Sequence, residues 1–154
     1  MVMNSSNTNV GGWNGSWANT TCMPQWKSCF PSDLQAVIRT TTLYTDNTGN
    51  RSASASAVTA NSNDVYYLAE YEVFGSNYYA NTNEPAQQAQ YAYYQAGNSR
   101  VKYRSDNTSS AAIWWLRSPN RSYSNTFCYV STDGSANYYS TAIGSNGSAP
   151  CFKV

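Results

Sequence analysis

The sequence contains no histidine and few charged residues. Charged residues make up 11% of its 154 residues, against roughly 25% in an ordinary soluble domain, and the net charge is +1. Nucleophilic catalysis needs a base beside the serine or cysteine, and the usual base is missing here, so we expect a protein that is not an enzyme. Because no basic stretch could neutralise a phosphate backbone, we do not expect nucleic-acid binding.

Long apolar segments are also missing. No run approaches the roughly 18 apolar residues of a membrane-spanning helix, so we expect no membrane insertion. Residues 1–10 are polar and have neither the basic nor the apolar region of a signal peptide. We therefore expect the chain to be the C-terminal part of a longer protein, or to reach its place by assembly into a virion.

The four cysteines, Cys22, Cys29, Cys128 and Cys151, form no C-x-x-C pair. A structural zinc site with the usual spacing is not expected, and we predict neither a metal nor a cofactor. Two interpretations of the cysteines stay open. Cys22 could pair with Cys29 and Cys128 with Cys151, or all four could be free thiols that pack as small hydrophobic side chains.

Aromatic residues are abundant, at 15% of the chain, with 14 tyrosines and 5 tryptophans. This content is too high for a disordered polar tract, despite the many Ser, Asn and Thr residues. The length fits one domain over residues 1–154, large enough to bury roughly two-thirds of its unfolded surface.

The local patterns predict an α+β domain with two or three helices and short antiparallel strands. Helical spacing runs from Ala18 to Thr40 with a break at Pro31, and a second helical pattern runs from Glu84 to Ala96. Strands are expected at residues 41–44, 65–69, 101–103, 113–116, 126–131, 137–143 and 151–154. Residues 1–17 are expected to be a lead-in segment, 46–50 a turn and 51–63 an exposed loop or hairpin.

Two rigid segments bracket a polar one. Trp114–Pro119 and Gly147–Val154 lie on either side of a stretch made almost entirely of Ser, Asn, Tyr, Thr, Gly and Asp. Aromatic and apolar residues bury, whereas tyrosine and short polar residues form adaptable contact surfaces. The pattern therefore predicts a stiff frame that displays a polar face. The expected structural anchors are Trp114, Trp115, Arg117, Phe127 and Phe152.

Motifs along the whole chain carry a resemblance to a known family. They are Gly11-Gly12-Trp13, Pro31–Leu34, Leu68–Gly75, Trp114–Pro119, Phe127–Val130, Asp133-Gly134 and the Gly-x-Ala-Pro-x-Phe ending. Together they resemble an uncharacterised domain family that is widespread in gut Firmicutes and their phages. That family is similar to the C-type lectin fold of formylglycine-generating enzymes and of variable proteins of diversity-generating retroelements.

The resemblance implies one C-type-lectin-like domain with a variable, ligand-binding region at residues 120–148. In that fold, an Arg-Gly-Gly-Ser-Trp-like strand and a Gly-Phe-Arg-like last strand bracket the ligand surface. Trp114–Pro119 and Ala149–Val154 occupy comparable positions here, although the Gly-Gly pair is absent.

The function implied by the resemblance is that of a non-catalytic receptor-binding module on a phage particle or bacterial cell surface. Its partner would be a protein or glycan on another cell, and it could belong to a larger virion or surface assembly. The expected contact residues are Asn120, Arg121, Ser122, Tyr123, Ser124, Asn125, Tyr129, Asn137, Tyr138, Tyr139, Ser140 and Thr141.

Two alternatives remain. The first is a structural decoration domain of a virion or cell surface whose polar face binds nothing specific. The second is an enzyme of the formylglycine-generating type, which would need Cys128 and Cys151 to bind copper, although their surroundings do not match that family's motif.

Several charged residues allow both a chemical and a structural role. Glu70 and Glu72 are two residues apart and could do acid–base chemistry, but we favour an ion pair or a helix cap. Arg117 could contact a ligand, but we favour hydrogen bonds from its guanidinium to loop carbonyls. Glu84, before Pro85, is interpreted as a helix start rather than a calcium ligand.

Overall fold

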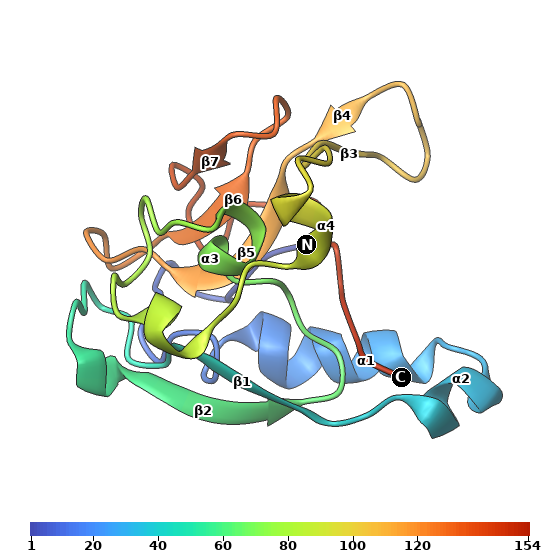
Figure 1. Cartoon of the computed structure of the whole chain (residues 1–154), viewed down its shortest axis with the longest axis horizontal. Helices are drawn as coiled ribbons and strands as arrows, with labels where there is room; N and C mark the ends of the chain where they lie inside the picture. Colours follow the sequence, from blue (N-terminus) through green and yellow to red (C-terminus); the bar gives the residue numbers. More distant parts are fainter.

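Three small antiparallel sheets and several short helices make up the structure, a computed structural model that describes residues 1–154 (Figure 1). The helical elements are a π-helical turn (Ala18–Cys22), α1 (Met23–Ser28), α2 (Ser32–Val37), a 3-10 turn (Ala55–Ala57), α3 (Glu70–Phe74), a second 3-10 turn (Glu84–Gln87) and α4 (Ala92–Gln95). The strands are β1 (Thr41–Asp46), β2 (Val58–Asn63), β3 (Lys102–Tyr103), β4 (Ala111–Ala112), β5 (Trp114–Pro119), β6 (Phe127–Val130) and β7 (Ala136–Asn137). The predicted α+β class is confirmed, and no helix has the length and apolar character of a bilayer span.

The strands β1 and β2 form a hairpin that lies across the middle of the molecule. Thr41 pairs with Asn63 at one end and Asp46 with Val58 at the other. Of the exposed loop or hairpin predicted at 51–63, residues 58–63 are the second strand of a hairpin with β1. Gly49 in the connecting turn has φ +61°, and a Cβ atom there would lie 1.9 Å from the carbonyl oxygen of Asn9. Glycine is therefore required at this position.

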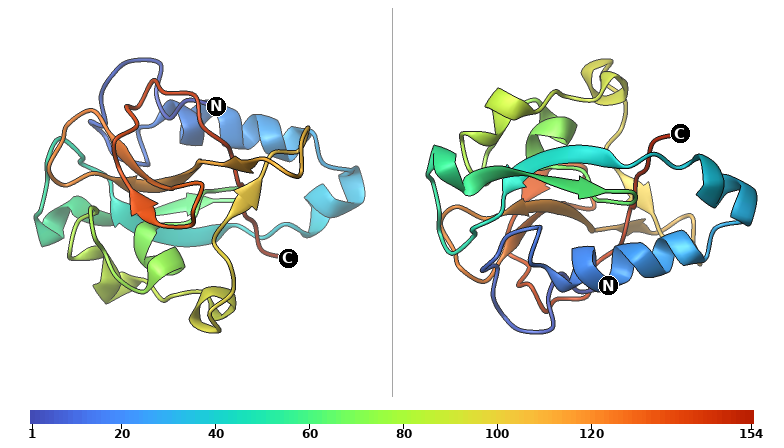
Figure 2. Two further views of the ribbon diagram at one scale, coloured as in Figure 1. Left: turned by 90° about the horizontal axis from the view of Figure 1, so that it is seen from above. Right: turned by 90° about the horizontal axis from the view of Figure 1, so that it is seen from below.

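The sheet β5-β6-β7 supplies the most deeply buried strands. Every residue of β5 and β6 is buried, and Trp114 and Trp115 are 1% and 0% exposed, which confirms their predicted core position. The pairing is irregular between Trp115 and Pro119, where the N–H of Arg117 donates to the carbonyl of Leu68 instead of to β6. Figure 2 shows α1 on one side of the central strands and α3 with α4 on the other.

Several predicted elements are shorter or different. Residues 65–69 are buried and extended but form no strand: Tyr66 makes one bridge to Cys151, and Leu68 accepts from β5. Their hydrogen bonds go to two different segments, which is why no ladder forms. The predicted strands at 151–154 and 137–143 likewise reduce to isolated bridges and the short β7.

The predicted helix from Glu84 to Ala96 is two separate turns. Gln88 is extended, with φ −125° and ψ 158°, and ends the 3-10 turn. The N–H of Tyr91 then donates to the carbonyl of Glu72 at 2.9 Å, so this stretch is held straight against α3 before α4 begins.

Residues 1–17 belong to the core and are not a lead-in segment. Met3 and Trp13 are fully buried, and the N–H groups of Met3 and Asn4 both donate to the carbonyl of Ala142 at 2.9 Å. The ring of Trp13 packs on Tyr67 with centroids 5.5 Å apart. The N-terminal segment therefore covers the core on the side where the loop around Ala142 lies.

Phe152 is 37% exposed and packs on Phe30, with ring centroids 5.3 Å apart, so its prediction as a buried anchor is wrong. All four cysteines are free thiols, with Cys22 and Cys128 buried. Of the two interpretations left open by the sequence, the structure therefore has the unpaired one.

Candidate binding surface

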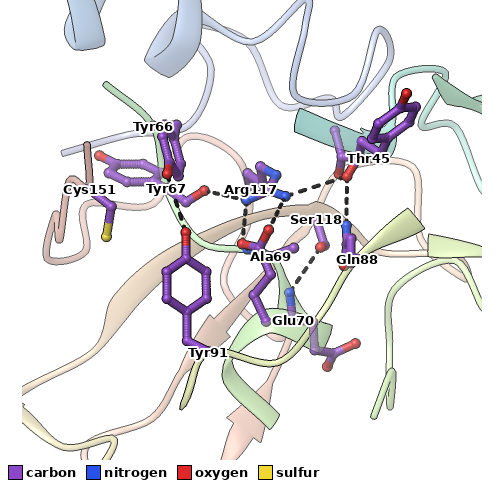
Figure 3. A network of polar contacts seen from close by, with 12 residues as sticks. Thr45, Tyr66, Tyr67, Ala69, Glu70, Gln88, Tyr91, Arg117, Ser118 and Cys151 are labelled. Carbon is purple, nitrogen blue, oxygen red and sulfur yellow. Dashed lines mark hydrogen bonds and ion pairs between the residues drawn. The ribbon is translucent and has the colours of Figure 1, made fainter. Parts of the chain in front are cut away.

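A buried ion pair joins β5 to α3. Arg117 is fully buried, and its guanidinium donates to both carboxylate oxygens of Glu72, at 2.6 and 2.7 Å. It also donates to the carbonyls of Tyr67, at 2.9 Å, and Tyr44, at 3.4 Å; Figure 3 shows it at the centre of these contacts. Glu72 also accepts from the N–H of Ala69 at 2.9 Å and so caps α3. Arg117 and Glu72 thus have the structural roles favoured from the sequence.

The charge on Arg117 is favoured despite its burial. Burial is the largest single influence and opposes the charge on Arg117, but the charge and hydrogen bonds of Glu72, together with Glu84, outweigh it, so the pKa of Arg117 is raised above its ordinary value. A guanidinium that is fully desolvated and fully charged needs its partner, because a lone buried charge is strongly destabilising. We infer that this pair fixes the position of β5 relative to α3.

Ser118, which follows Arg117 on β5, joins the backbone of Glu70 to the carboxylate of Glu84. Its hydroxyl accepts from the N–H of Glu70 at 3.1 Å, the contact drawn in Figure 3, and donates to Glu84 at 2.8 Å. Glu84 is fully buried and accepts from the hydroxyl of Thr45 at 2.8 Å and the N–H of Asp46 at 2.9 Å. Burial raises the pKa of Glu84. Glu84 does begin a 3-10 turn, but its side chain also ties β1 to β5, which the sequence did not reveal.

Glu70 holds the loop after α3 in place. Its carboxylate accepts from the N–H of Tyr79 at 3.0 Å and of Ala80 at 2.8 Å. Burial raises the pKa of Glu70 to about 7, although these N–H groups act in the opposite direction. On the other side of this loop, the N–H of Arg121 donates to the carbonyl of Tyr79 at 2.9 Å, and Ala80 bridges to Asn120. Residues 79–80 are therefore fixed between the network and the segment after β5.

Asn9 fixes the segment after β5 from the opposite side. It is fully buried, and its amide Nδ2 donates to the carbonyls of Asn120 at 3.3 Å, Tyr123 at 2.8 Å and Thr126 at 2.8 Å. Its backbone N–H donates to the carbonyl of Ser124 at 2.7 Å. One side chain from the N-terminal segment thus sets the path of the loop between β5 and β6.

Five tyrosines gather above these supports, and we call them the tyrosine surface. Tyr138 lies at the centre, with ring centroids 4.5 Å from Tyr79, 5.4 Å from Tyr123 and 4.5 Å from Tyr139. Tyr78 continues the row at 6.4 Å from Tyr79. Tyr78, Tyr123 and Tyr139 are 54%, 49% and 74% exposed. The rings pack on one another, and the exposed ones, Tyr78, Tyr123 and Tyr139, still offer contact area to solvent.

Two grooves lie beside the tyrosine surface, with Tyr78–Tyr79 lining both. The first, of about 360 Å³, is also lined by Phe74, Arg100 and residues 134–136, and we call it the Arg100 groove. The second, of about 320 Å³, is also lined by residues 120–123 and Tyr138, and we call it the Arg121 groove. Both volumes fall within the range of roughly 300–1,000 Å³ that small-molecule sites occupy.

A larger polar groove, of about 450 Å³, lies between α1, α2 and β2, away from the tyrosines. Its charged side chains, Lys27 and Asp64, pair with each other at 2.7 Å. Its amides are also engaged, because Asn63 donates to Asn19. The polar groups of this groove thus bond to one another, whereas those of the tyrosine surface face outward.

Part of the predicted contact set does lie on the tyrosine surface. Tyr123 and Tyr139 are exposed, as is Ser122, and Arg121 and Tyr138 are half-buried beside them. These are the predicted residues that the fold brings together on one accessible face.

Two predicted contact residues are buried, so their prediction as ligand contacts is wrong. Asn120 is 2% exposed, and its Oδ1 accepts from the N–H groups of Ser122 at 2.6 Å and Tyr123 at 3.1 Å, which shapes the turn. Tyr129 is 5% exposed and packs edge-on against Trp115 with ring centroids 6.0 Å apart. Both side chains serve the scaffold.

The remaining predicted contacts are half-buried residues of loops and of the short strand β7. The carbonyl of Asn125 accepts from Ala142, and Ser124 carries the carbonyl that accepts from Asn9. Asn137 accepts through Oδ1 from the N–H of Tyr138 at 2.7 Å. Ser140 accepts from Asn146, and Thr141 pairs with Thr126.

The sequence reasoning missed the part of the surface that lies outside residues 120–148. Tyr78, Tyr79, Phe74 and Arg100 come from α3 and the segments after it. A signal was present, because residues 77–83 have the same Asn, Tyr and Thr composition as the segment after Pro119.

Comparison with known proteins gives a family for this chain. Residues 2–154 match the family described as a domain of unknown function, DUF6273, and the chain belongs to it. No curated protein and no solved structure matches the chain. Because the match covers nearly the whole chain, family membership applies to the tyrosine surface and its scaffold alike.

Proposed function

We propose that this DUF6273 domain is a non-catalytic binding module that recognises a protein or glycan on another cell through the tyrosine surface. The observation that carries the proposal is the stacked tyrosine cluster with its outward faces. Tyrosine offers a large contact area with few rotatable bonds, so little conformational entropy is lost on binding. The support beneath is rigid, because Glu70 and Asn9 hold the backbone of the loops that carry the rings.

We further infer that the fold is C-type-lectin-like. The chain just before the second bracketing segment, Ala149–Val154, lies beside the first: Trp114 forms a bridge with Gly147. The N–H of Trp115 donates to Gly147 at 3.1 Å, and Gly147 donates to Ile113 at 2.7 Å. The chain between these segments therefore leaves and returns at one place, which supports the display of residues 120–146 as one unit.

We place the module on a phage particle or bacterial cell surface, by the family resemblance of its motifs. Single contacts of this kind are weak, and display in many copies would raise the avidity without any new contact. A structural decoration domain is the first rival, and it predicts that the tyrosine surface has no ligand.

The surroundings of the cysteines favour a binding module over a formylglycine-type enzyme. Metal ligation and redox chemistry use the thiolate. Burial raises the pKa of Cys128 well above its ordinary value and raises that of Cys151 as well. Cys128 also faces Glu70 and Glu84, which disfavour a thiolate there.

Cell binding tests the proposal. Labelled protein is mixed with a panel of gut bacterial strains, and bound protein is counted by flow cytometry. For a strain that is bound, Tyr123→Ser and Tyr139→Ser should each reduce binding about tenfold, as expected when a central aromatic contact is lost. The matched control is Tyr103→Ser, because Tyr103 is 58% exposed but lies on β3, outside the tyrosine surface.

Two outcomes contradict the proposal. If no strain is bound, or if the tyrosine variants bind as well as the Tyr103→Ser control, the tyrosine surface does not recognise cells. The decoration-domain alternative would then be preferred.

A further inference from the structure

We propose that the ligand of the tyrosine surface is an anionic glycan, with its sugar rings on the tyrosines and its acidic groups on Arg100 and Arg121. The inference rests on the proposed function and names the ligand class for the same surface. It is carried by the charge of the two grooves, by the hydrogen-bond donors left free there, and by the side chains that line them.

Each groove contains one arginine and no acidic lining residue. The carboxylates in the vicinity are already engaged. Glu70 is buried beneath the loop and accepts from the backbone of Tyr79 and Ala80, and Asp133 accepts from Ser135 at 2.7 and 2.9 Å. Asp133 is exposed and negatively charged next to the residues that line the Arg100 groove, so it offsets part of the charge of Arg100. The accessible charge in the Arg121 groove is positive, which fits a ligand of negative charge.

Both guanidinium groups have N–H donors that form no hydrogen bond within the protein. Arg100 makes one hydrogen bond, from Nε to the carbonyl of Val73 at 3.3 Å, and lies 5.0 Å from the centre of the Phe74 ring. Arg121 makes one side-chain hydrogen bond, to the carbonyl of Ala80 at 3.2 Å. A guanidinium has five N–H donors in a planar fork that matches a carboxylate or phosphate. The existing bonds and the Phe74 ring orient each fork and leave most of it free.

The tyrosine rings suit a sugar. A pyranose ring has an apolar face of C–H groups and a rim of hydroxyl groups, so it can lie flat on an aromatic face while its hydroxyls meet polar groups. Tyr138 stacks on Tyr123 with an interplanar angle of 18° and on Tyr139 with one of 28°, so the stacked faces cover one another. Tyr139, which is 74% exposed, is the ring of this stack that is most accessible to a sugar. The hydroxyl of Ser122 lies beside this stack in the Arg121 groove.

The two grooves suit a chain of sugars. Tyrosine and arginine are also the residues of protein hot spots, so binding of the oligosaccharide probes decides between a glycan and a protein partner. Apart from aromatic rings, the only apolar side chain that lines either groove is Ala136. Because Tyr78 and Tyr79 line both grooves, a chain of sugars could occupy one groove and continue into the next.

Calorimetry with defined oligosaccharides tests this inference. The probes are a galacturonate tetramer, its methyl ester, which has the same sugars without the charge, and a mannose oligosaccharide that carries phosphate. We expect one or both acidic probes to bind at least about tenfold more tightly than the ester, and to bind more weakly as salt is raised, because salt screens exposed charges. The preferred acidic probe tells whether the anion is a carboxylate or a phosphate.

Arginine variants give the second arm of the test. Arg100→Gln and Arg121→Gln should each weaken binding of the preferred acidic probe about tenfold, and the lysine variants should recover part of it. The control is Arg104→Gln, since Arg104 is exposed and paired with Asp106 outside the grooves. Circular dichroism confirms that each variant is folded.

The outcomes separate this inference from the proposed function. Equal binding of the ester, no binding of any acidic probe, or arginine variants that bind like Arg104→Gln would overturn the anionic-glycan inference. If the tyrosine variants still lose cell binding in that case, the proposed function stands with another ligand. If cell binding is also insensitive to the tyrosines, both fail.

Discussion

The strand β5 joins two regions whose polar side chains have opposite environments: they are buried in one region and exposed in the other. In the first region, Arg117 and Ser118 are fully buried. The guanidinium of Arg117 donates to Glu72, and the hydroxyl of Ser118 donates to Glu84. A few residues later, past Pro119, tyrosine and serine side chains face solvent, and their neighbouring arginine has donors to spare. Residue type therefore does not separate the scaffold from the surface. Polar side chains of the scaffold are buried and have hydrogen-bond partners, whereas those of the surface are exposed and have unused donors.

The two regions also differ in where their supports come from. The buried network joins side chains to side chains, as between Arg117 and Glu72. The tyrosine surface is held through its backbone, by Asn9 and Glu70. Changes in the buried network, or in the supports Asn9 and Glu70, should therefore act on folding, and changes in the tyrosine side chains themselves should act on binding.

The largest expected effect comes from breaking the buried ion pair. Arg117→Met leaves Glu72 buried without its partner, and we expect the free energy of unfolding to fall by about 3–5 kcal/mol. Denaturant titration measures it. The control is Lys27→Met, because the Lys27–Asp64 pair is about one-third exposed and is expected to contribute at most about 1 kcal/mol. Equal losses for the two variants would contradict the special role of the buried pair.

The next effect is a dependence of stability on pH. Burial raises the pKa of Glu70 to about 7 in the folded protein, so between pH ~4.5 and ~7 the folded state binds more protons than the unfolded state. The free energy of unfolding should therefore fall as pH rises through this window, by at most about 3 kcal/mol. Denaturant titrations at pH 5 and pH 8 measure the difference.

Glu70→Gln should flatten this pH dependence, because glutamine does not titrate. A smaller slope of the same sign would remain from Glu84, whose pKa burial also raises. If the variant kept the full pH dependence of the unmodified protein, Glu70 would not be its source.

A smaller effect is expected at the support beneath the surface. Asn9→Asp keeps the shape but replaces the amide donor with a carboxylate that faces three backbone carbonyls. We expect a loss of about 2–3 kcal/mol, since a buried polar group would be left without its partners. Asn7→Asp, at an exposed residue, is the control and should change stability little. Similar unfolding midpoints for both variants would exclude this role for Asn9.

The smallest effect on stability should be found on the surface itself. Tyr139→Ser should change the free energy of unfolding by less than about 0.5 kcal/mol, because its ring is 74% exposed. Thermal unfolding measured beside cell binding would show a variant that folds normally and does not bind. A large loss of stability would instead place Tyr139 in the scaffold.

The sequence predicted the features with a local signature. The buried strand around Trp114 and Trp115, the α+β class and the turn after Asp46 were all readable from neighbouring residues. Contacts between distant segments were not. Glu72 and Arg117 are 45 residues apart, and Asn9 and Asn120 are 111 apart, so no periodic pattern connects them. For the same reason, the loop of Tyr78 and Tyr79 could not be placed beside Tyr138 before the fold was known.

The way Asn9 holds the loop after β5 has a consequence for evolution. Its amide binds main-chain carbonyls at residues 120, 123 and 126, atoms that every amino acid possesses. Outward-facing positions such as 122 and 123 can therefore be rewritten, codon by codon, while the loop keeps its course. If the proposed function holds, substitutions at these positions should change which ligand is bound and leave the folding of the loop intact.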